Sequence, residues 1–188
     1  MNVKKGCFGY IASRRKRQLV IAALLCAAAV AMFLFGYIRY GSNRNIMSIM
    51  AALTCLPAGW AIVNTVMFFR ARGCSEESRE RIRPHVGELL DAYDLYLTSY
   101  SENYPLSHLC ICGKTIAAFS EEARMSSASA EKHMKKMMEN EGFDGYSLKI
   151  YFSIDKYTER LDQMNQLEDQ GSVKRMQQLL DLFYSISL

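Results

Sequence analysis

The chain has 188 residues, half of them hydrophobic, and a net charge of +4. This length suits one domain of modest size and excludes two. Residues 1–84 hold 13 Lys and Arg against 3 acidic residues, whereas residues 85–188 hold 10 against 16. The positive charge therefore belongs to the first part of the chain, and the acidic second part argues against nucleic acid as a ligand.

Two long apolar runs dominate the first part. Residues 19–38 and 46–69 contain no charged side chain. A helix needs about 20 apolar residues to cross a hydrocarbon core of about 30 Å, and both runs reach that length. A cleaved signal peptide does not fit, because its apolar core is about 7–15 residues long and here a second apolar run follows directly. We predict a two-span transmembrane helical hairpin over residues 19–69.

Basic residues flank the predicted spans unevenly. The connection between the spans carries only Arg39 and Arg44, and the excess lies outside the hairpin. Such an excess marks the cytoplasmic side, which predicts a multi-pass cell-membrane protein with both termini in the cytoplasm, as in a bacterial inner membrane. Near anionic lipid headgroups each basic residue contributes roughly 1 kcal/mol. The residues expected at that surface are Lys4, Lys5, Arg14, Arg15, Lys16 and Arg17 in the basic N-terminus (residues 1–18), and Arg70 and Arg72 after the second span.

Small residues recur at four-residue spacing in both spans. The two rows are Ala23, Ala27 and Ala31 in the first span and Ala51, Cys55 and Gly59 in the second. Such rows let helix backbones approach closely, either within the hairpin or in a homo-oligomer formed through the spans. Neither span holds the ionisable residues that ion pathways need, so the hairpin is expected to anchor rather than to transport.

The rest of the chain predicts a small cytoplasmic α+β domain. Residues 70–84 form a basic juxtamembrane helix with Ser75 as its N-cap, and Pro84 breaks it. Residues 85–188 form an acidic domain with the order α-β-β-α-β-α-α. Its first helix is expected over residues 85–100, and a helix over 125–142 and a strand over 146–154 follow the central hairpin. In the last helix, the inward face is predicted to comprise Val173, Met176, Leu179, Leu180 and Phe183.

The stretch HLCICGKTIAAFS, residues 108–120, is predicted to be a β-hairpin. Gly113 and Lys114 suit a two-residue turn, which pairs Cys112 with Thr115 and His108 with Phe119. One face then holds Leu109, Ile111, Ile116 and Ala118, and the other holds Cys110, Cys112, Ala117 and Phe119. Because both faces are small or apolar, the hairpin should be central and covered by helices on both sides.

The same stretch offers the main alternative, a metal or redox site. His108, Cys110 and Cys112 share one face of the strand, but neighbouring positions on that face are about 6.6 Å apart, so one zinc ion takes two of them more easily than three. Glu121 is a candidate further ligand. Structural zinc sites use tighter knuckles such as CxxC, and we expect the cysteines to be buried core residues.

No motif for nucleotide binding, metalloprotease chemistry or a nucleophile elbow is present in the sequence, and no cofactor is expected. The sequence therefore predicts a membrane-tethered cytoplasmic interaction or regulatory module without catalytic activity, with an unknown protein partner or a second copy of itself. The alternatives are a membrane-bound enzyme, a metal or redox sensor that uses His108, Cys110 and Cys112, and a small subunit of a larger membrane complex.

Overall fold

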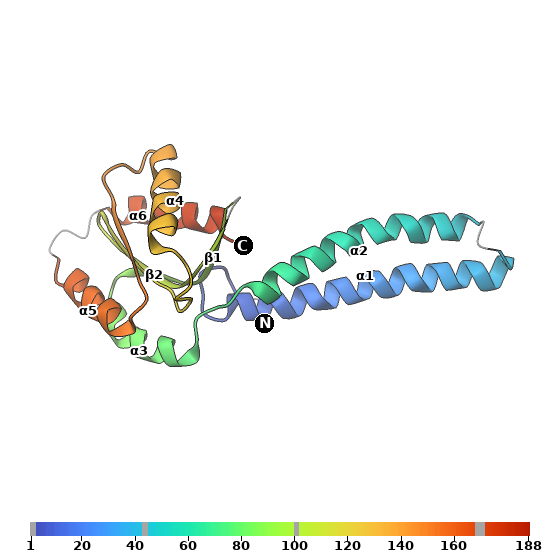
Figure 1. Cartoon of the computed structure of the whole chain (residues 1–188), viewed down its shortest axis with the longest axis horizontal. Coiled ribbons are helices and arrows are strands. Elements are labelled where there is room, and N and C mark those ends of the chain that lie inside the picture. The colour runs from blue at the N-terminus through green and yellow to red at the C-terminus, as the bar shows by residue number, and fades with distance from the viewer. Residues whose placement is uncertain (1–2, 43–44, 100–101, 168–171) are drawn as a thin grey trace. The chain divides into compact units, whose positions relative to one another are not determined.

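The computed structural model describes residues 3–42, 45–99, 102–167 and 172–188, and has a mixed α+β fold (Figure 1). The chain divides into two compact units. Residues 11–71 form the first, here called the hairpin unit, and residues 1–10 together with 72–188 form the second, called the sheet unit. Residues 43–44 of the predicted connection between the spans lie outside the described residues.

The hairpin unit consists of α1 (Tyr10–Tyr40) and α2 (Ile46–Arg70). Both helices are long and apolar enough to cross a membrane. In α1 the buried positions Ala22, Ala29 and Gly36 recur every seven residues. In α2 the buried positions, at spacings of three, four or seven residues, are Ala51, Ala58, Ala61, Thr65 and Phe68. This periodicity is that of two helices that pack along a coiled-coil seam.

The predicted small-residue rows are not this seam. Ala23, Ala27 and Ala31 are all exposed on α1, and of the row in α2 only Ala51 is buried. The prediction that these rows pack the hairpin is therefore wrong, because a four-residue spacing drifts away from a seam that repeats every seven residues. The row on α1 faces outward, and a homo-oligomer through it stays a prediction.

Replacing Ala29 by Leu is expected to loosen the hairpin, whereas replacing Ala27 by Leu is not. Ala29 is buried and Ala27 is exposed, so the added volume overpacks only the first position, at a cost of about 1–3 kcal/mol. Unfolding of the full chain in mixed micelles measures the difference in stability between the two variants. Equal destabilisation by both variants would contradict the seam.

Chemical crosslinking of the same two variants tests the predicted homo-oligomer. If the exposed row Ala23, Ala27 and Ala31 mediates it, Ala27→Leu should weaken the crosslinking.

The sheet unit is built on a four-stranded sheet in the order β1-β2-β3-β4. Its strands are β1 (Leu90–Thr98), β2 (Asn103–Cys112), β3 (Thr115–Phe119) and β4 (Ser147–Tyr151), of which only β3 and β4 are parallel. The predicted hairpin is confirmed, with Cys112 opposite Thr115 and His108 opposite Phe119. Gly113 has a φ of 57°, the left-handed value that the first turn position requires.

The predicted helix over residues 85–100 is wrong, because residues 90–98 form strand β1 and only residues 85–86 are helical, as the end of α3 (Glu76–Val86). Residue 100 lies outside the described residues. The burial of β1 is almost continuous from Ala92 to Leu97, since helices cover both faces of the sheet. A strand buried on both faces has no alternation, and its apolar residues can then fall at helical spacing by chance. Helix α3, which precedes β1, is capped by Ser75 as predicted, but it runs through Pro84.

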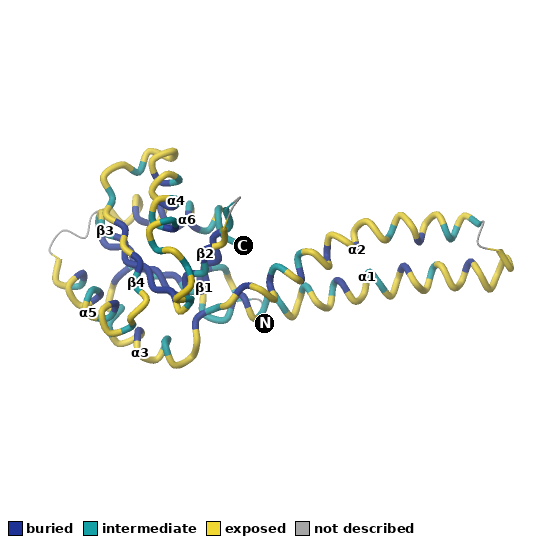
Figure 2. The backbone as a smooth tube through the Cα atoms, in the orientation of Figure 1, coloured by how far each residue is buried: buried dark blue, intermediate teal, exposed yellow. Residues whose placement is uncertain are grey.

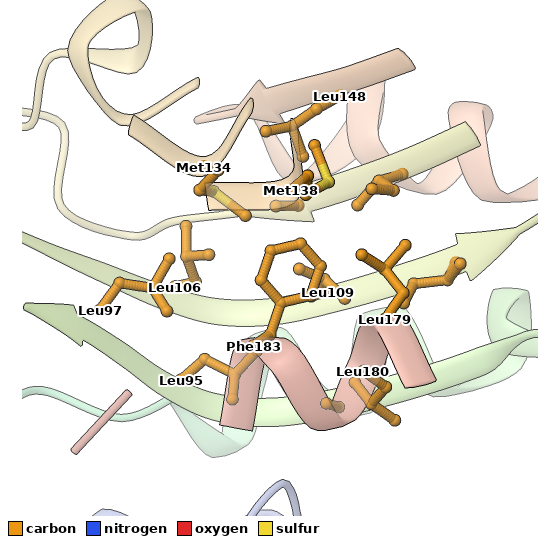
Figure 3. Close-up of a cluster of buried hydrophobic side chains, with 14 of the residues drawn as sticks. Leu95, Leu97, Leu106, Leu109, Met134, Met138, Leu148, Leu179, Leu180 and Phe183 are labelled. Carbon is orange, nitrogen blue, oxygen red and sulfur yellow. The ribbon is translucent and has the colours of Figure 1, made fainter. Parts of the chain in front are cut away.

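Helices cover both faces of the sheet (Figure 2). On one face α4 (Ser127–Asn140) and α6 (Val173–Ile186) enclose the main core, and on the other lie α3 and α5 (Ile154–Asn165). The two predicted hairpin faces are divided between these layers as expected. Figure 3 shows Phe183, Leu179 and Leu180 of α6 directed at the strands. Val173 differs from the prediction, because it is 71% exposed at the first residue of α6.

The outer edge of β1 is covered by the two ends of the chain. The Tyr93 N–H donates to the Gly6 carbonyl at 2.8 Å, and the Leu188 N–H donates to the Tyr96 carbonyl at 2.9 Å. Lys5 Nζ donates to the carbonyls of Tyr184 and Ser187 near the end of α6, at 2.7 and 2.6 Å. These contacts satisfy otherwise open groups of an edge strand and a helix end. The N-terminal segment before α1 is therefore an integral part of the sheet unit.

Candidate functional site

A row of polar side chains crosses the sheet face that α3 and α5 cover. In the antiparallel pairing Tyr93 lies opposite His108, and Asp91 lies opposite Cys110. Directly opposite residues point to the same face of a sheet, so the four side chains gather there. Tyr157 of α5 joins them from the covering helix. The result is a polar cluster within an otherwise apolar layer.

His108 lies at the centre of this cluster. Its Nδ1 is 2.7 Å from the Tyr157 hydroxyl, and its Nε2 is 3.2 Å from Asp91 Oδ2. The His108 and Tyr157 side chains are completely buried, whereas a third of the Asp91 side chain is exposed. A neutral imidazole that donates from Nε2 to Asp91 and accepts the Tyr157 O–H at Nδ1 satisfies both ring nitrogens. The chain of hydrogen bonds thus runs from the core to the surface and ends at Asp91.

The buried members of the cluster favour their neutral forms. Burial lowers the pKa of His108, and the hydrogen bond and charge of Asp91 oppose this only in part. Burial likewise raises the pKa of the Tyr157 hydroxyl and of the Cys110 thiol. A protonated, buried thiol is a poor nucleophile and a poor redox centre. Of the three hydrogen-bonded residues Asp91, His108 and Tyr157, only Asp91 is exposed enough to contact a ligand.

Asp91 opens into a pocket of about 530 Å³ in the sheet unit. The walls come from α3, from β1, from α6 and from the N-terminal segment, and the lining residues are Gly6, Cys7, Phe8, Arg79, Arg83, Val86, Gly87, Asp91, Tyr93 and Tyr184. The Phe8 and Tyr93 rings meet edge to face with centroids 6.1 Å apart. Burial, with a smaller effect from Asp91, raises the pKa of Tyr93 to about 12, so its hydroxyl stays protonated.

Arg79 and Arg83 give the pocket its positive charge. They lie one turn apart on α3, and this spacing places both side chains on one side of the helix. The Arg79 guanidinium lies 4.4 Å from the centroid of the Phe8 ring, and its Nη1 is 2.7 Å from Glu76 Oε1. The pocket thus combines two guanidinium groups with one carboxylate, which lies at the end of the buried hydrogen-bond chain.

The predicted metal candidates are only partly brought together. Cys110 Sγ lies 3.9 Å from His108 Nδ1, but Cys112 Sγ instead points to the Met164 carbonyl at 3.6 Å. Glu121 accepts hydrogen bonds from the backbone and hydroxyl of Ser75 at 3.0 and 2.8 Å. Within the described part of the chain, no three His, Cys, Asp or Glu side chains are grouped so that they could hold a metal ion.

The predicted membrane-surface residues divide into two groups. Lys5 holds the end of α6, and Arg15 donates to the carbonyls of Phe68 and Ala71 at 3.1 and 2.9 Å, so both have structural partners. Arg72 lies 3.9 Å from Glu122, and its side chain remains 83% exposed. Exposed residues of the predicted set also include Lys4, Lys16, Arg17 and Arg70, whereas Arg14 is half-buried.

Sequence reasoning missed Asp91, Tyr157, Arg79 and Arg83 as site residues. Asp91 was hidden by the assignment of its segment to a helix, which removed it from the neighbourhood of His108. The spacing of Arg79 and Arg83 was a usable signal, because both lie in the part of α3 that was predicted to be helical. Nothing in the sequence indicates that the hydroxyl of Tyr157 meets His108.

The free energy of unfolding is expected to decrease as the pH is lowered, because of His108. The folded protein keeps this imidazole neutral, since burial lowers its pKa, while the unfolded chain binds a proton below about pH 6.5. The stabilising contribution is therefore present above that pH and is lost as the pH falls towards the folded pKa, by up to about 1.4 kcal/mol per pH unit. Urea unfolding of wild type and His108→Gln between pH 7.5 and 5 measures the slope. An equal slope in both proteins would contradict the neutral histidine.

No protein-family model, curated protein or solved structure matches this chain.

Proposed function

We propose that the chain is a membrane-tethered cytoplasmic interaction or regulatory module without catalytic activity. The two apolar helices are the tether, and the sheet unit is the part that meets a partner. The observation that carries this proposal lies within the sheet unit: the two segments that flank the hairpin unit in sequence are both hydrogen-bonded to neighbouring residues of β1.

The two attachments lie side by side in sequence on β1. Before the hairpin unit, the Gly6 carbonyl accepts from the Tyr93 N–H at 2.8 Å. After it, the Cys74 N–H donates to Asp94 Oδ1 at 2.8 Å. Asp94 is buried and has a φ of 56°, a left-handed backbone that is uncommon for a residue with a side chain. Such strain persists only where the surroundings enforce it, which supports a specific role for this junction.

These attachments support a topology with both flanks on one side of a membrane. A folded unit cannot lie on both sides of a bilayer, so the segments that precede and follow α1 and α2 share a compartment. The basic residues around the hairpin favour the cytoplasm for that compartment. The buried, neutral thiol of Cys110 and the buried, neutral His108 favour an interaction role for this cluster over nucleophilic or redox chemistry.

Site-specific photocrosslinking in native membranes tests the proposal. A photoreactive residue is placed at Lys135 on α4 or at Glu159 on α5, both exposed, and at Ser42 beyond α1 as the control. We expect a discrete adduct from a sheet-unit position, absent from position 42 and displaced by excess unlabelled chain. Adducts only from exposed positions of the spans, such as Leu24, would instead indicate a small subunit of a larger complex. Turnover of a substrate by the purified chain, or no adduct from the sheet unit, would contradict the proposal.

The distance of 3.9 Å between His108 Nδ1 and Cys110 Sγ favours a metal sensor as the second candidate. In that case the purified full chain should carry zinc or iron in stoichiometric amount, and Cys110→Ser should lose it. Elemental analysis of both proteins decides this. A metal-free wild-type chain isolated without chelators would rule out the metal version.

A further inference from the structure

We propose that the pocket between the N-terminal segment, α3 and β1 binds a phosphate ester that carries a hydroxyl or ammonium group next to the phosphate, such as phosphoglycerol. A phospholipid headgroup and a free ester share this chemistry. The inference goes beyond the proposed function, because a ligand can occupy the pocket whether or not the domain has a protein partner.

The two arginines supply the phosphate site. Arg79 and Arg83 both line the pocket, and a guanidinium fork matches the geometry of phosphate oxygens better than an ammonium does. Arg79 is held in place by Phe8 and Glu76, so less conformational entropy is lost when it binds. Arg83 is exposed, and the residues that the structure describes offer it neither a hydrogen bond nor an ion pair. Its guanidinium is therefore available to a ligand.

Asp91 sets the second requirement. Its carboxylate lines the same pocket, and His108 Nε2 holds Oδ2 at 3.2 Å. A bare anion would be repelled by this carboxylate, whereas a ligand with a hydroxyl or ammonium group can donate to it while its phosphate meets the arginines. The rings of Phe8 and Tyr93 give the intervening carbon atoms an apolar wall. A volume of about 530 Å³ is in the range of small-molecule sites.

Cys7 provides a reporter, because it lines the pocket and is exposed. The full chain in detergent, with Cys26 and Cys55 replaced by Ala, leaves only buried cysteines besides Cys7. Its alkylation rate is followed by mass spectrometry with glycerol phosphate, inorganic phosphate, or a short-chain phosphatidylglycerol or phosphatidylcholine. We expect both glycerol esters to protect Cys7 and inorganic phosphate to protect roughly tenfold less well. Phosphatidylcholine, whose quaternary ammonium has no N–H to donate to Asp91, should protect less well than phosphatidylglycerol.

Substitutions in the pocket, with one control outside it, locate the effect. Arg79→Gln and Arg83→Gln should each weaken protection roughly tenfold, whereas Arg124→Gln, an exposed arginine outside this pocket, should leave it unchanged. Asp91→Asn should remove the preference for glycerol phosphate over inorganic phosphate, with folding checked by protease resistance.

Protection by the lipid at lower concentrations than by the free ester assigns the ligand to the membrane, and the reverse order assigns it to solution. The proposal is overturned if neither ester protects Cys7, if the double variant R79Q/R83Q is still protected, or if Asp91→Asn keeps the preference.

Discussion

Replacing Gly6 by Ala is expected to destabilise the sheet unit by about 2–4 kcal/mol. Gly6 has a φ of 85°, where a residue with a Cβ is strained, and a Cβ there would overlap the Tyr184 hydroxyl. The ring of Tyr184, a residue of α6, must then move away from Gly6, and the hydrogen bond from Tyr93 to Gly6 is disturbed. Pulse proteolysis of the full chain across a urea series measures the change.

Gly9→Ala is the matched control. Gly9 has a similar φ of 80°, but apart from its two chain neighbours no described residue has an atom within 4 Å of the position of its Cβ, so only the backbone cost of about 1 kcal/mol remains. In a Tyr184→Ala background, the effect of Gly6→Ala should shrink towards that of Gly9→Ala. Equal effects of the two substitutions in the wild-type background would mean that the N-terminal segment does not pack on the sheet unit.

Replacing Phe183 by Ala is expected to cost about 3–5 kcal/mol of the free energy of unfolding. The Phe183 side chain is completely buried, and it extends from α6 over β1 and β2, where Leu95 and Leu109 lie (Figure 3). Removal of the ring loses its transfer free energy and leaves a cavity that rigid strands cannot fill. Val173→Ala on the same helix should change stability by less than about 0.5 kcal/mol, because Val173 is exposed. A similar loss in both variants would place the core elsewhere.

The sequence predicted the local parts of the fold well. The hairpin around Gly113 was predictable in full register, because one turn dipeptide fixes every pair that follows. The cap Ser75 begins α3 as expected, since a hydroxyl before a helical pattern is a local signal. The two apolar helices follow from length and composition alone.

Long-range pairing explains what the sequence did not predict. Leu90–Thr98 is a strand only because β2 pairs with it, and no local pattern records that pairing. The pocket depends on the same pairing, because it places Asp91 beside His108. The hydrogen bonds of Lys5 to the end of α6 could not be predicted either, since its partners are 179 and 182 positions away in sequence. A basic residue near a predicted span was read as a lipid contact for lack of that information.

Cysteine accessibility in intact cells tests the central proposal, a membrane tether whose two flanking segments belong to one cytoplasmic unit. Cys26 and Cys55 are replaced by Ala, so that Cys7 is the only exposed cysteine. In two further variants Cys7 is also replaced and Ser42→Cys or Glu77→Cys is added. With a membrane-impermeant maleimide, we predict rapid labelling at position 42 in intact cells. Positions 7 and 77 should react only after permeabilisation. Labelling of positions 7 and 77 on opposite sides of the membrane, or no labelling at position 42, would contradict the proposal.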